Sequence, residues 1–343
     1  MIYGPKKHIT ASIKAQTMHP RQRGMALLIV LFIVALVSVL ATEMGSRLQL
    51  QVQRASNIKD NNQAYWYSIG AEAYAMLAIK ELYELDDGNI HLNQPWAQPL
   101  IYPIENGQIT ATISDSQACF NINALAQTAG STPTSGNRKT TPAMDAFAAL
   151  LREITNGDTY AADVLRDSLV DYLDANTVAL PDGAEDDTYL GLRYPYLSAN
   201  TLLSEVSELR LVNGVNLEWF ADLLKFVCVI PNNQNLVINI NTLLDEDKIL
   251  LSAITGLSVA DAQSLIESRP ENGYASPADF FAEPEMAGIT LSDTQQTWFA
   301  TTTEYFTLTT ITQYNETQFT LTSLMHVAKQ QNVSVIQRTF GRR

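Results

Sequence analysis

Histidine, cysteine and positive charge are scarce in this sequence. Its 343 residues include four histidines, two cysteines and 22 Lys and Arg residues, against 36 Asp and Glu residues. A zinc site built from His and Cys ligands is therefore disfavoured. The formal net charge of −14 also disfavours nucleic acid, because affinity for nucleic acid comes largely from Lys and Arg that neutralise phosphates. We predict no nucleic-acid partner and expect divalent cations or basic proteins instead.

Charge is missing altogether from residues 25–42, while residues 1–24 carry five Lys and Arg residues and no acid. This uncharged run of 18 residues is near the lower limit of about 17–25 residues for a membrane-spanning helix. A buried core helix is the alternative, but it does not explain the dense cationic flank. Because excess Lys and Arg lie on the cytoplasmic side of a membrane, we predict a single-pass span with a cytoplasmic N-terminus and an exported domain.

The boundary residue is Gly24, which precedes the apolar run. A secretory signal has its small-residue cleavage site after the apolar run, on the far side of the membrane. Cleavage after Gly24 would instead remove the basic leader and leave the apolar helix on the mature protein, with Met25 as its first residue. That helix could anchor the protein and later pack against other subunits.

Proline is absent from Met25 to Gln94, so no residue in that range forces a break in a helix. Beyond Glu43, apolar residues recur at steps of mostly three or four, which is the spacing of one helix face. We predict one helix from about Met25 to Leu85, roughly 90 Å long, which packs on a globular domain through this stripe and ends in a turn at Asp86–Asn89. The stripe consists of Met44, Leu48, Val52, Ala55, Ile58, Tyr65, Ile69, Ala73 and Leu77.

Helical and strand patterns divide the rest of the chain. Amphipathic spacing predicts short helices over 143–154, 160–173, 200–212 and 218–227. Alternating segments rich in β-branched residues predict strands over 306–312, 318–325 and 333–336, with another near 108–113. Residues 127–142 are rich in Thr, Ser, Gly and Pro and predict an exposed loop. These strands favour a small antiparallel sheet on which the long helix packs.

The two cysteines are Cys119 and Cys228. An exported domain meets an oxidising compartment, which favours a disulfide between them. Both lie in apolar segments, so two separate buried thiols are the alternative. We predict a structural Cys119–Cys228 disulfide, which would close a long loop and restrict the unfolded chain.

Carboxylates are concentrated from Asp171 to Asp187, where six fall within 17 residues, and no Lys or Arg lies between Arg166 and Arg193. Like charges at this density repel one another and raise one another's pKa unless something neutralises them. A solvated acidic loop is the alternative, but the interleaved Leu, Tyr and Pro residues do not suit one. Calcium takes about six to eight oxygen ligands, so we predict one or two structural calcium ions.

Paired carboxylates could also hydrolyse a glycoside, which makes a membrane-anchored periplasmic hydrolase an alternative. The histidines are scattered, and the sequence shows no G-x-S-x-G motif, no Cys–His pairing and no phosphate-binding loop. We therefore predict that the protein is not an enzyme.

A short repeat brackets the middle of the chain. Phe120–Leu125 recurs as Val237–Leu243, and the second copy leads into a segment over 249–280 that resembles a helix-hairpin-helix module around Gly256. Such modules often bind the DNA backbone. Asp261, close behind the hairpin, disfavours a phosphate at that helix N-terminus, so we expect the module to serve packing.

The leader, Gly24, the apolar helix and its amphipathic extension resemble the type IV pilin and type II secretion pseudopilin class. Residues 167–176, 183–189 and 207–215 narrow the resemblance to the minor pseudopilin K family of type II secretion (general secretion pathway protein K). The Gly-Ala-Glu-Asp-Asp-Thr-Tyr sequence at 183–189 is the specific motif. A minor pilin of a type IV pilus or DNA-uptake machine is the alternative, and the acidic composition argues against it.

The resemblance implies an α+β pseudopilin fold, in which a long N-terminal helix packs on a small antiparallel sheet with a large inserted all-helical domain. The implied segments are the leader over 1–24, a transmembrane helix over 25–42, a helix extension and first part of the pseudopilin domain over 43–120, the insertion over 121–300 and C-terminal strands over 301–343. The implied calcium ligands are Asp171, Asp174, Asn176, Asp182, Glu185, Asp186 and Asp187.

In function, the resemblance implies a subunit at the pseudopilus tip that initiates and caps assembly, for export of folded periplasmic proteins across the outer membrane. It implies cleavage after Gly24 by a prepilin peptidase, methylation of Met25, an inner-membrane anchor and a periplasmic domain. The implied partners are minor pseudopilins I and J, the inner-membrane assembly platform, and the outer-membrane secretin or cargo.

The fifth mature position departs from the pattern of the class. Most members carry Glu there, paired with the N-terminal amine of an adjoining subunit, whereas this chain has Ile29. A buried glutamate without a cationic partner is costly, and a subunit with nothing above it meets no such amine. Ile29 is therefore consistent with a tip subunit.

The cleavage prediction can be checked on protein extracted from membranes. Because the peptidase would cut after Gly24 and the new amine would be methylated, mass spectrometry should find methylated Met25 as the first residue. An intact leader in the membrane-extracted protein would contradict the prediction.

Overall fold

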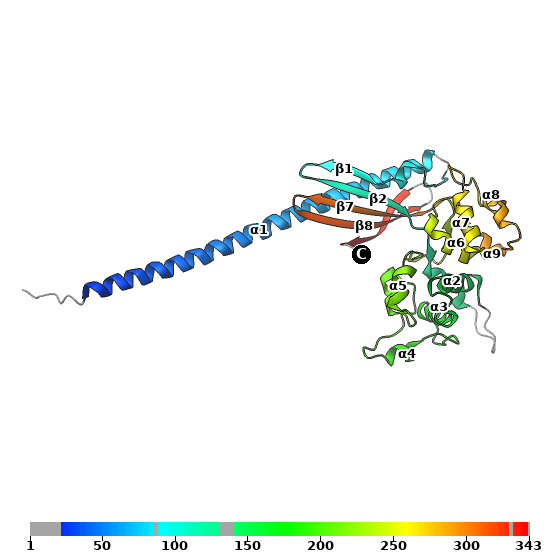
Figure 1. Cartoon of the computed structure of the whole chain (residues 1–343), viewed down its shortest axis with the longest axis horizontal. Coiled ribbons are helices and arrows are strands. Elements are labelled where there is room, and N and C mark those ends of the chain that lie inside the picture. The colour runs from blue at the N-terminus through cyan, green and yellow to red at the C-terminus, as the bar shows by residue number, and fades with distance from the viewer. Residues whose placement is uncertain (1–21, 86–87, 131–139, 329–331, 342–343) are drawn as a thin grey trace, which may run out of the picture. The chain divides into compact units, whose positions relative to one another are not determined.

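The computed structural model describes residues 22–85, 88–130, 140–328 and 332–341 (Figure 1). Outside these residues lie most of the predicted leader, Asp86 and Asp87 of the predicted turn, and residues 131–139 of the predicted exposed loop. The chain divides into two units, residues 1–60 and residues 61–343. The second unit holds the last part of the long helix, the sheet and all the shorter helices.

The long helix α1 runs from Gln22 to Leu85 without interruption, which confirms the predicted helix. Side chains from Gly24 to Lys59 are exposed. Among the helices in the described residues, α1 alone is long and apolar enough to cross a membrane by length and composition.

A five-stranded antiparallel sheet, in the order β1-β2-β7-β8-β9, receives the last part of α1. Its strands are β1 (Leu100–Ile104), β2 (Gly107–Asp115), β7 (Tyr305–Tyr314), β8 (Thr317–Ala328) and β9 (Asn332–Phe340). The four strands predicted from the sequence are confirmed as β2, β7, β8 and β9. The edge strand β1, preceded by the short 3-10 helix η1 (Pro95–Ala97), was not predicted, because Leu-Ile-Tyr-Pro-Ile does not alternate.

The face of α1 that packs on the sheet differs from the predicted stripe, whose last members Ala73 and Leu77 are exposed. The buried residues are Ala64, Ser68, Glu72, Ala75, Ile79 and Leu82. Two of these are polar, and a pattern of apolar spacing therefore could not find this face. Ser68 Oγ lies 2.7 Å from Thr312 Oγ1 on β7, so the sheet supplies the polar partner.

Glu72 connects α1 to the C-terminal edge strand. Only 2% of Glu72 is exposed, and Arg338 of β9 donates from Nε at 2.9 Å and from Nη2 at 2.8 Å to its two carboxylate oxygens. Burial acts to raise the pKa of Glu72, but the hydrogen bonds from Arg338 and Ser323 and the charge of Arg338 hold it below its ordinary value. The bidentate pair fixes β9 and α1 to each other in a single register.

The chain between β2 and β7 forms one large insertion (Figure 1). Its longer helices are α2 (Pro142–Ile154), α3 (Thr159–Leu173), α5 (Leu217–Leu223), α6 (Lys248–Thr255) and α7 (Val259–Glu267). Its short helices are η2 (Ile122–Gly130), α4 (Asp186–Leu190), η3 (Val206–Leu211), η4 (Asp245–Asp247), α8 (Pro277–Phe281), η5 (Pro284–Met286) and α9 (Asp293–Gln296). The apolar faces of the longer helices share one core that includes Phe120, Phe147, Leu165, Leu250 and Phe280.

Two predicted helices are wrong in extent. The helix predicted over 200–212 is only the 3-10 turn η3, and the helix predicted over 218–227 is shortened to α5. The reason at the first site is Asn123, whose side chain accepts from the Leu203 N–H and donates to the Leu203 carbonyl, both at 2.9 Å. These bonds occupy the Leu203 backbone groups that a helix would use.

The internal repeat has a structural counterpart. Each copy begins with a two-residue parallel ladder, β3 (Phe120–Asn121) with β4 (Val227–Cys228) and β5 (Ile238–Asn239) with β6 (Phe299–Ala300). Each copy also carries two buried asparagines that bond to distant backbone. They are Asn121, Asn123, Asn239 and Asn241. Within the described residues, these two ladders are the only strands of the insertion, and its other regular elements are helices joined by loops.

The predicted helix-hairpin-helix is formed by α6 and α7. Gly256 has a φ of 81°, a left-handed conformation that glycine adopts without steric cost. The Ser258 hydroxyl accepts from the Asp261 N–H at 3.1 Å and caps α7, so Asp261 supports the turn locally.

Cys119 and Cys228 form a disulfide with a Cα–Cα distance of 5.8 Å, as predicted. The bond lies beside the β3–β4 ladder and closes the first half of the insertion.

Candidate functional site

The acidic segment follows the C-terminus of α3 and continues into α4. Asp158 caps the N-terminus of α3 by accepting from the Ala161 N–H, and the helix ends at Leu173 with Asp174 as its C-cap. The predicted carboxylates are therefore distributed over one helix end, one loop and one short helix.

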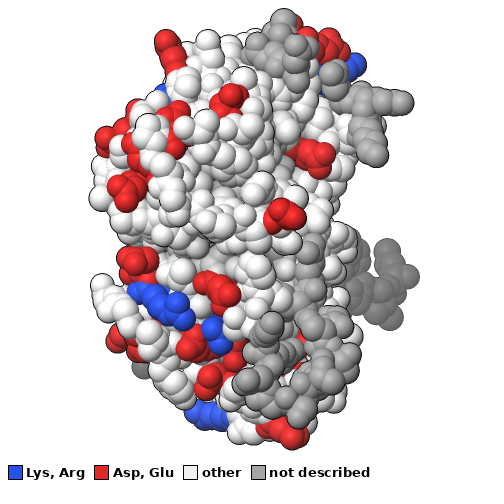
Figure 2. Space-filling model, turned by 90° about the vertical axis from the view of Figure 1, so that its right-hand side faces the viewer, with Lys and Arg blue, Asp and Glu red and all other residues white. Residues whose placement is uncertain are grey.

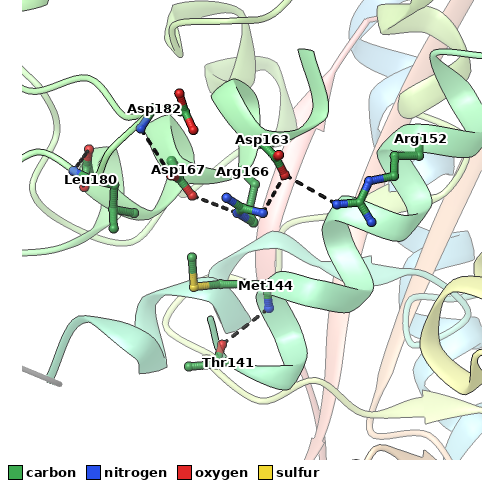
Figure 3. Close-up of polar contacts among 9 residues, drawn as sticks. Thr141, Met144, Arg152, Asp163, Arg166, Asp167, Leu180 and Asp182 are labelled. Carbon is green, nitrogen blue, oxygen red and sulfur yellow. Dashed lines mark hydrogen bonds and ion pairs between the residues drawn. The ribbon is translucent and has the colours of Figure 1, made fainter. Parts of the chain in front are cut away.

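Asp171 and Asp167 hold the loop against α3. Both oxygens of Asp171 accept from the Leu180 N–H, at 2.9 and 3.2 Å. Asp167 accepts from Arg166 Nε at 2.7 Å and from the Asp182 N–H at 3.4 Å (Figure 3). These two buried carboxylates thus act on the loop backbone.

Gly183 is required by this arrangement. A Cβ atom at Gly183 would lie 1.8 Å from Asp171 Oδ2, so any other residue would push Asp171 away from Leu180. The glycine in the specific sequence motif at 183–189 is thereby explained by close packing.

Asp174 and Asn176 form successive turns. Asp174 Oδ1 accepts from the Asn176 N–H at 3.0 Å, and Asn176 Oδ1 accepts from the Val178 N–H at 2.7 Å. Such side-chain-to-backbone bonds favour a tight loop.

Glu185 is a buried carboxylate near the negative charges of Asp174 and Asp186. It is 6% exposed, and its Oε1 has no hydrogen-bond partner among the described residues. Burial raises the pKa of Glu185 to about 7, and the charges of Asp174 and Asp186 add to the rise. The site thus contains a buried oxygen without a donor and a repulsion that a cation would relieve.

Ser198 also faces this cluster. Its hydroxyl lies 2.6 Å from Asp186 Oδ1 and 3.5 Å from Glu185 Oε2, and its N–H donates to Asp186 at 3.0 Å. The side-chain atoms of this cluster that could bind a metal are all oxygens, a set that suits a hard cation such as calcium.

The structure brings Asp174, Glu185 and Asp186 together but not the whole predicted set. Asp182 and Asp187 are exposed, while Asp171 and Asn176 bond to the backbone. Within the residues described, no group of three or more His, Cys, Asp or Glu side chains is arranged to hold a metal ion. A calcium ion would therefore have to draw ligands together, and the calcium prediction stays untested.

Asp167 and Ser198 belong to the acidic site but were not predicted from the sequence. Asp167 could have been found, because it precedes Asp171 by four residues and so lies on the same face of α3. Ser198 carries no signal of this kind, since its place beside Glu185 depends on the path of the chain after α4.

The processing residues lie within α1. A Cβ atom at Gly24 would meet no atom within 4 Å outside its own stretch of helix, and Met25 and Ile29 are exposed. This exposure does not test cleavage after Gly24 or methylation of Met25, and both stay predictions.

A second candidate site is the face of α1 opposite the sheet. In the part that packs on the sheet, Trp66, Tyr74 and Leu77 are 64%, 62% and 67% exposed. Gly70 and Ala73, also exposed, complete a stripe at helical spacing, which we call the outer stripe. Large exposed apolar residues in a row are typical of a protein–protein interface.

Acidic residues are spread over the face shown in Figure 2, while Lys and Arg occupy only a few positions on it. This distribution agrees with the formal net charge of −14.

The raised pKa of Glu185 predicts a pH dependence in calcium-free protein. An acid whose folded pKa lies above its unfolded value contributes stability that is present at low pH and is lost as pH rises through the folded pKa. With the pKa moving from 4.5 to about 7, wild type should lose up to about 3 kcal/mol relative to Glu185→Gln between pH 4 and pH 8.

Chemical denaturation in a chelator at both pH values measures this difference. Glu316→Gln, at an exposed turn between β7 and β8, is the matched control and should keep the wild-type pH dependence. Parallel curves for wild type and Glu185→Gln would contradict the assignment.

Known proteins resemble the insertion and, in some cases, most of the chain. Two models of the type II secretion system protein K family match, at residues 118–232 and 238–302. Type II secretion system protein K of Pectobacterium carotovorum subsp. carotovorum is 34% identical over 327 residues, covering 94% of this chain and 98% of the relative. The protein K of Aeromonas hydrophila is 36% identical over 259 residues, covering 74% and 78%.

A solved structure agrees with these relatives. The crystal structure of the GspK–GspI–GspJ complex from the enterotoxigenic Escherichia coli type 2 secretion system contains a chain that matches with a TM-score of 0.75 and 32% identity, covering 84% of this chain and 100% of that chain. The predicted fold class is confirmed, and the apolar N-terminal helix fits a single-pass membrane anchor. The chain belongs to the type II secretion system protein K family.

Proposed function

We propose that the protein is a minor pseudopilin that initiates and caps the type II secretion pseudopilus. The observation that carries this proposal is the outer stripe of α1. A helix that packs on its own sheet through one face and exposes Trp66, Tyr74 and Leu77 on the other is suited to pack on helices of other subunits.

The tip position is supported by two features. Ile29 replaces the glutamate that would need the amine of a subunit above it. The insertion between β2 and β7 adds a large body to the sheet, and this bulk would obstruct a further subunit.

The partners follow from the crystallised relative, which forms a complex with GspI and GspJ. We propose the corresponding minor pseudopilins I and J as partners of this chain. The prepilin peptidase and the inner-membrane assembly platform would act on α1, and the insertion would face the secretin or cargo. The N-terminus would be cytoplasmic and the sheet and insertion periplasmic, with no enzymatic activity.

We further propose that the acidic loop binds calcium in a structural role. Asp174, Glu185 and Asp186 would supply the carboxylates, and the unpartnered Oε1 of Glu185 supports a cation there. The other predicted residues Asp171, Asn176, Asp182 and Asp187 would shape the loop or complete the shell of one or two ions. The bound ion would neutralise the repulsion and fasten the loop to α3.

Calcium binding predicts a thermal shift. Because the ion binds the folded state, a chelator should lower the melting temperature of the processed protein, and added calcium should restore it while magnesium does so less. Glu185→Gln should lose most of this shift, whereas Glu316→Gln should keep it. An unchanged melting temperature in chelator and in calcium would rule out the ion.

The outer stripe predicts the behaviour of the complex with minor pseudopilins I and J. Leu77→Glu puts a charge into an apolar interface and should weaken assembly of the ternary complex at least about tenfold in affinity. Tyr160→Glu changes a residue on α3 that is 72% exposed and should leave assembly unchanged.

Binding of the processed proteins in detergent, measured by titration, separates two failures. Wild type that forms no complex would contradict the proposed partners. A complex in which Leu77→Glu binds as tightly as wild type would contradict the outer stripe as the interface.

A further inference from the structure

Asp115 is the last residue of β2, at the point where the chain leaves the sheet for the insertion. Its side chain has no part in the acidic loop or the outer stripe. Each of its carboxylate oxygens accepts two hydrogen bonds. Oδ1 accepts from the Gln117 N–H at 2.7 Å and the Thr303 hydroxyl at 2.6 Å, and Oδ2 accepts from the Thr242 hydroxyl at 2.6 Å and Asn239 Nδ2 at 3.1 Å.

The four donors come from three segments that are far apart in sequence. Gln117 starts the insertion, Asn239 and Thr242 lie at the end of β5 and just after it, and Thr303 ends the insertion just before β7. All four residues are buried. Asp115 therefore bonds to the segment where the chain enters the insertion, to the segment where it leaves the insertion, and to a third segment inside it.

Gln117 extends this junction. Its Oε1 accepts from the Glu304 N–H at 2.5 Å, and its Nε2 donates to the Val237 carbonyl at 3.4 Å. Other hydrogen bonds between the insertion and the rest of the domain include exposed ones, such as Asn93 Nδ2 with Glu271 Oε1 at 3.4 Å and Gln337 Nε2 with the Ser204 carbonyl at 3.3 Å. Hydrogen bonds to a charged acceptor are about twice as strong as neutral ones.

We propose that Asp115 is a latch that holds the insertion in one orientation on the sheet. The two ladders, β3 with β4 and β5 with β6, lie within the insertion and do not join it to the sheet. A carboxylate with four donors aimed at it from three segments fixes their relative positions. This inference does not depend on calcium binding or on the partners proposed above.

The chemistry explains why the residue is aspartate and not asparagine. An amide nitrogen in place of Oδ1 would face the Gln117 N–H, and one in place of Oδ2 would face the Asn239 amide N–H. Asn239 cannot turn its oxygen toward position 115, because Oδ1 already accepts from the Asn241 N–H at 3.0 Å. Asp115→Asn therefore sets donor against donor in either orientation, although it keeps the shape of the side chain.

Distance measurements between spin labels test the latch. Cysteines are placed at Glu316, in the β7–β8 turn, and at Tyr160, on α3, both exposed, in the processed full chain in detergent with the native disulfide intact. Pulsed electron paramagnetic resonance should give one narrow distance distribution for otherwise wild-type protein. Asp115→Asn should broaden it roughly twofold, because the insertion then samples several orientations.

Two controls keep the test decisive. Asp293→Asn, at an exposed carboxylate in the first turn of α9, should leave the distribution narrow. Thr303→Val removes one donor and should broaden the distribution, while Thr303→Ser keeps the hydroxyl and should not. These threonine variants decide the question if Asp115→Asn does not fold.

The outcomes are opposed. Broadening in each of Asp115→Asn and Thr303→Val that folds, with a narrow distribution in Asp293→Asn and Thr303→Ser, supports the latch. A folded Asp115→Asn or Thr303→Val protein with the wild-type distribution overturns it, as does equal broadening in Asp293→Asn.

Discussion

The packing of α1 on the five-stranded sheet is the interaction on which the rest of the structure depends. The helix presents Ala64, Ala75, Ile79 and Leu82 to the sheet, with Ser68 and Glu72 between them. The Glu72 carboxylate accepts hydrogen bonds from Nε and Nη2 of Arg338, so the packing has a fixed register. Because this face is fixed, the opposite face of the same helix is left exposed and available to other subunits.

Strands β2 and β7 are neighbours in the sheet, but the helical insertion lies between them in the sequence. Pairing between these strands brings the two ends of the insertion together. At that point Asp115 and Thr303 meet, and Cys119 is bonded to Cys228 just beyond. A charged acceptor and a covalent bond thus lie where a large body joins a small sheet.

Carboxylates serve opposite purposes in different parts of this acidic chain. At Asp115, Asp167 and Asp171, hydrogen-bond donors surround the charge, so these residues stabilise the backbone around them. At Glu185 one buried oxygen has no donor in the described structure, and neighbouring carboxylates add to the repulsion. The contrast distinguishes carboxylates that fold the chain from those that are suited to a cation.

The sequence by itself determined the features that depend on local pattern. The uncharged run after Gly24, the length of α1, four of the five strands, α6 and α7 around Gly256 and the pairing of the two cysteines all follow from spacing, composition or the expected compartment. Only the tertiary structure decided which face of α1 is buried, because Ser68 and Glu72 are polar and their partners lie on distant strands. It also decided that Leu203 is not helical, since Asn123 occupies its backbone, and that Ser198 faces Glu185. Each of these depends on a partner 13 to 266 residues away in the chain, and a local pattern holds no information on such a partner.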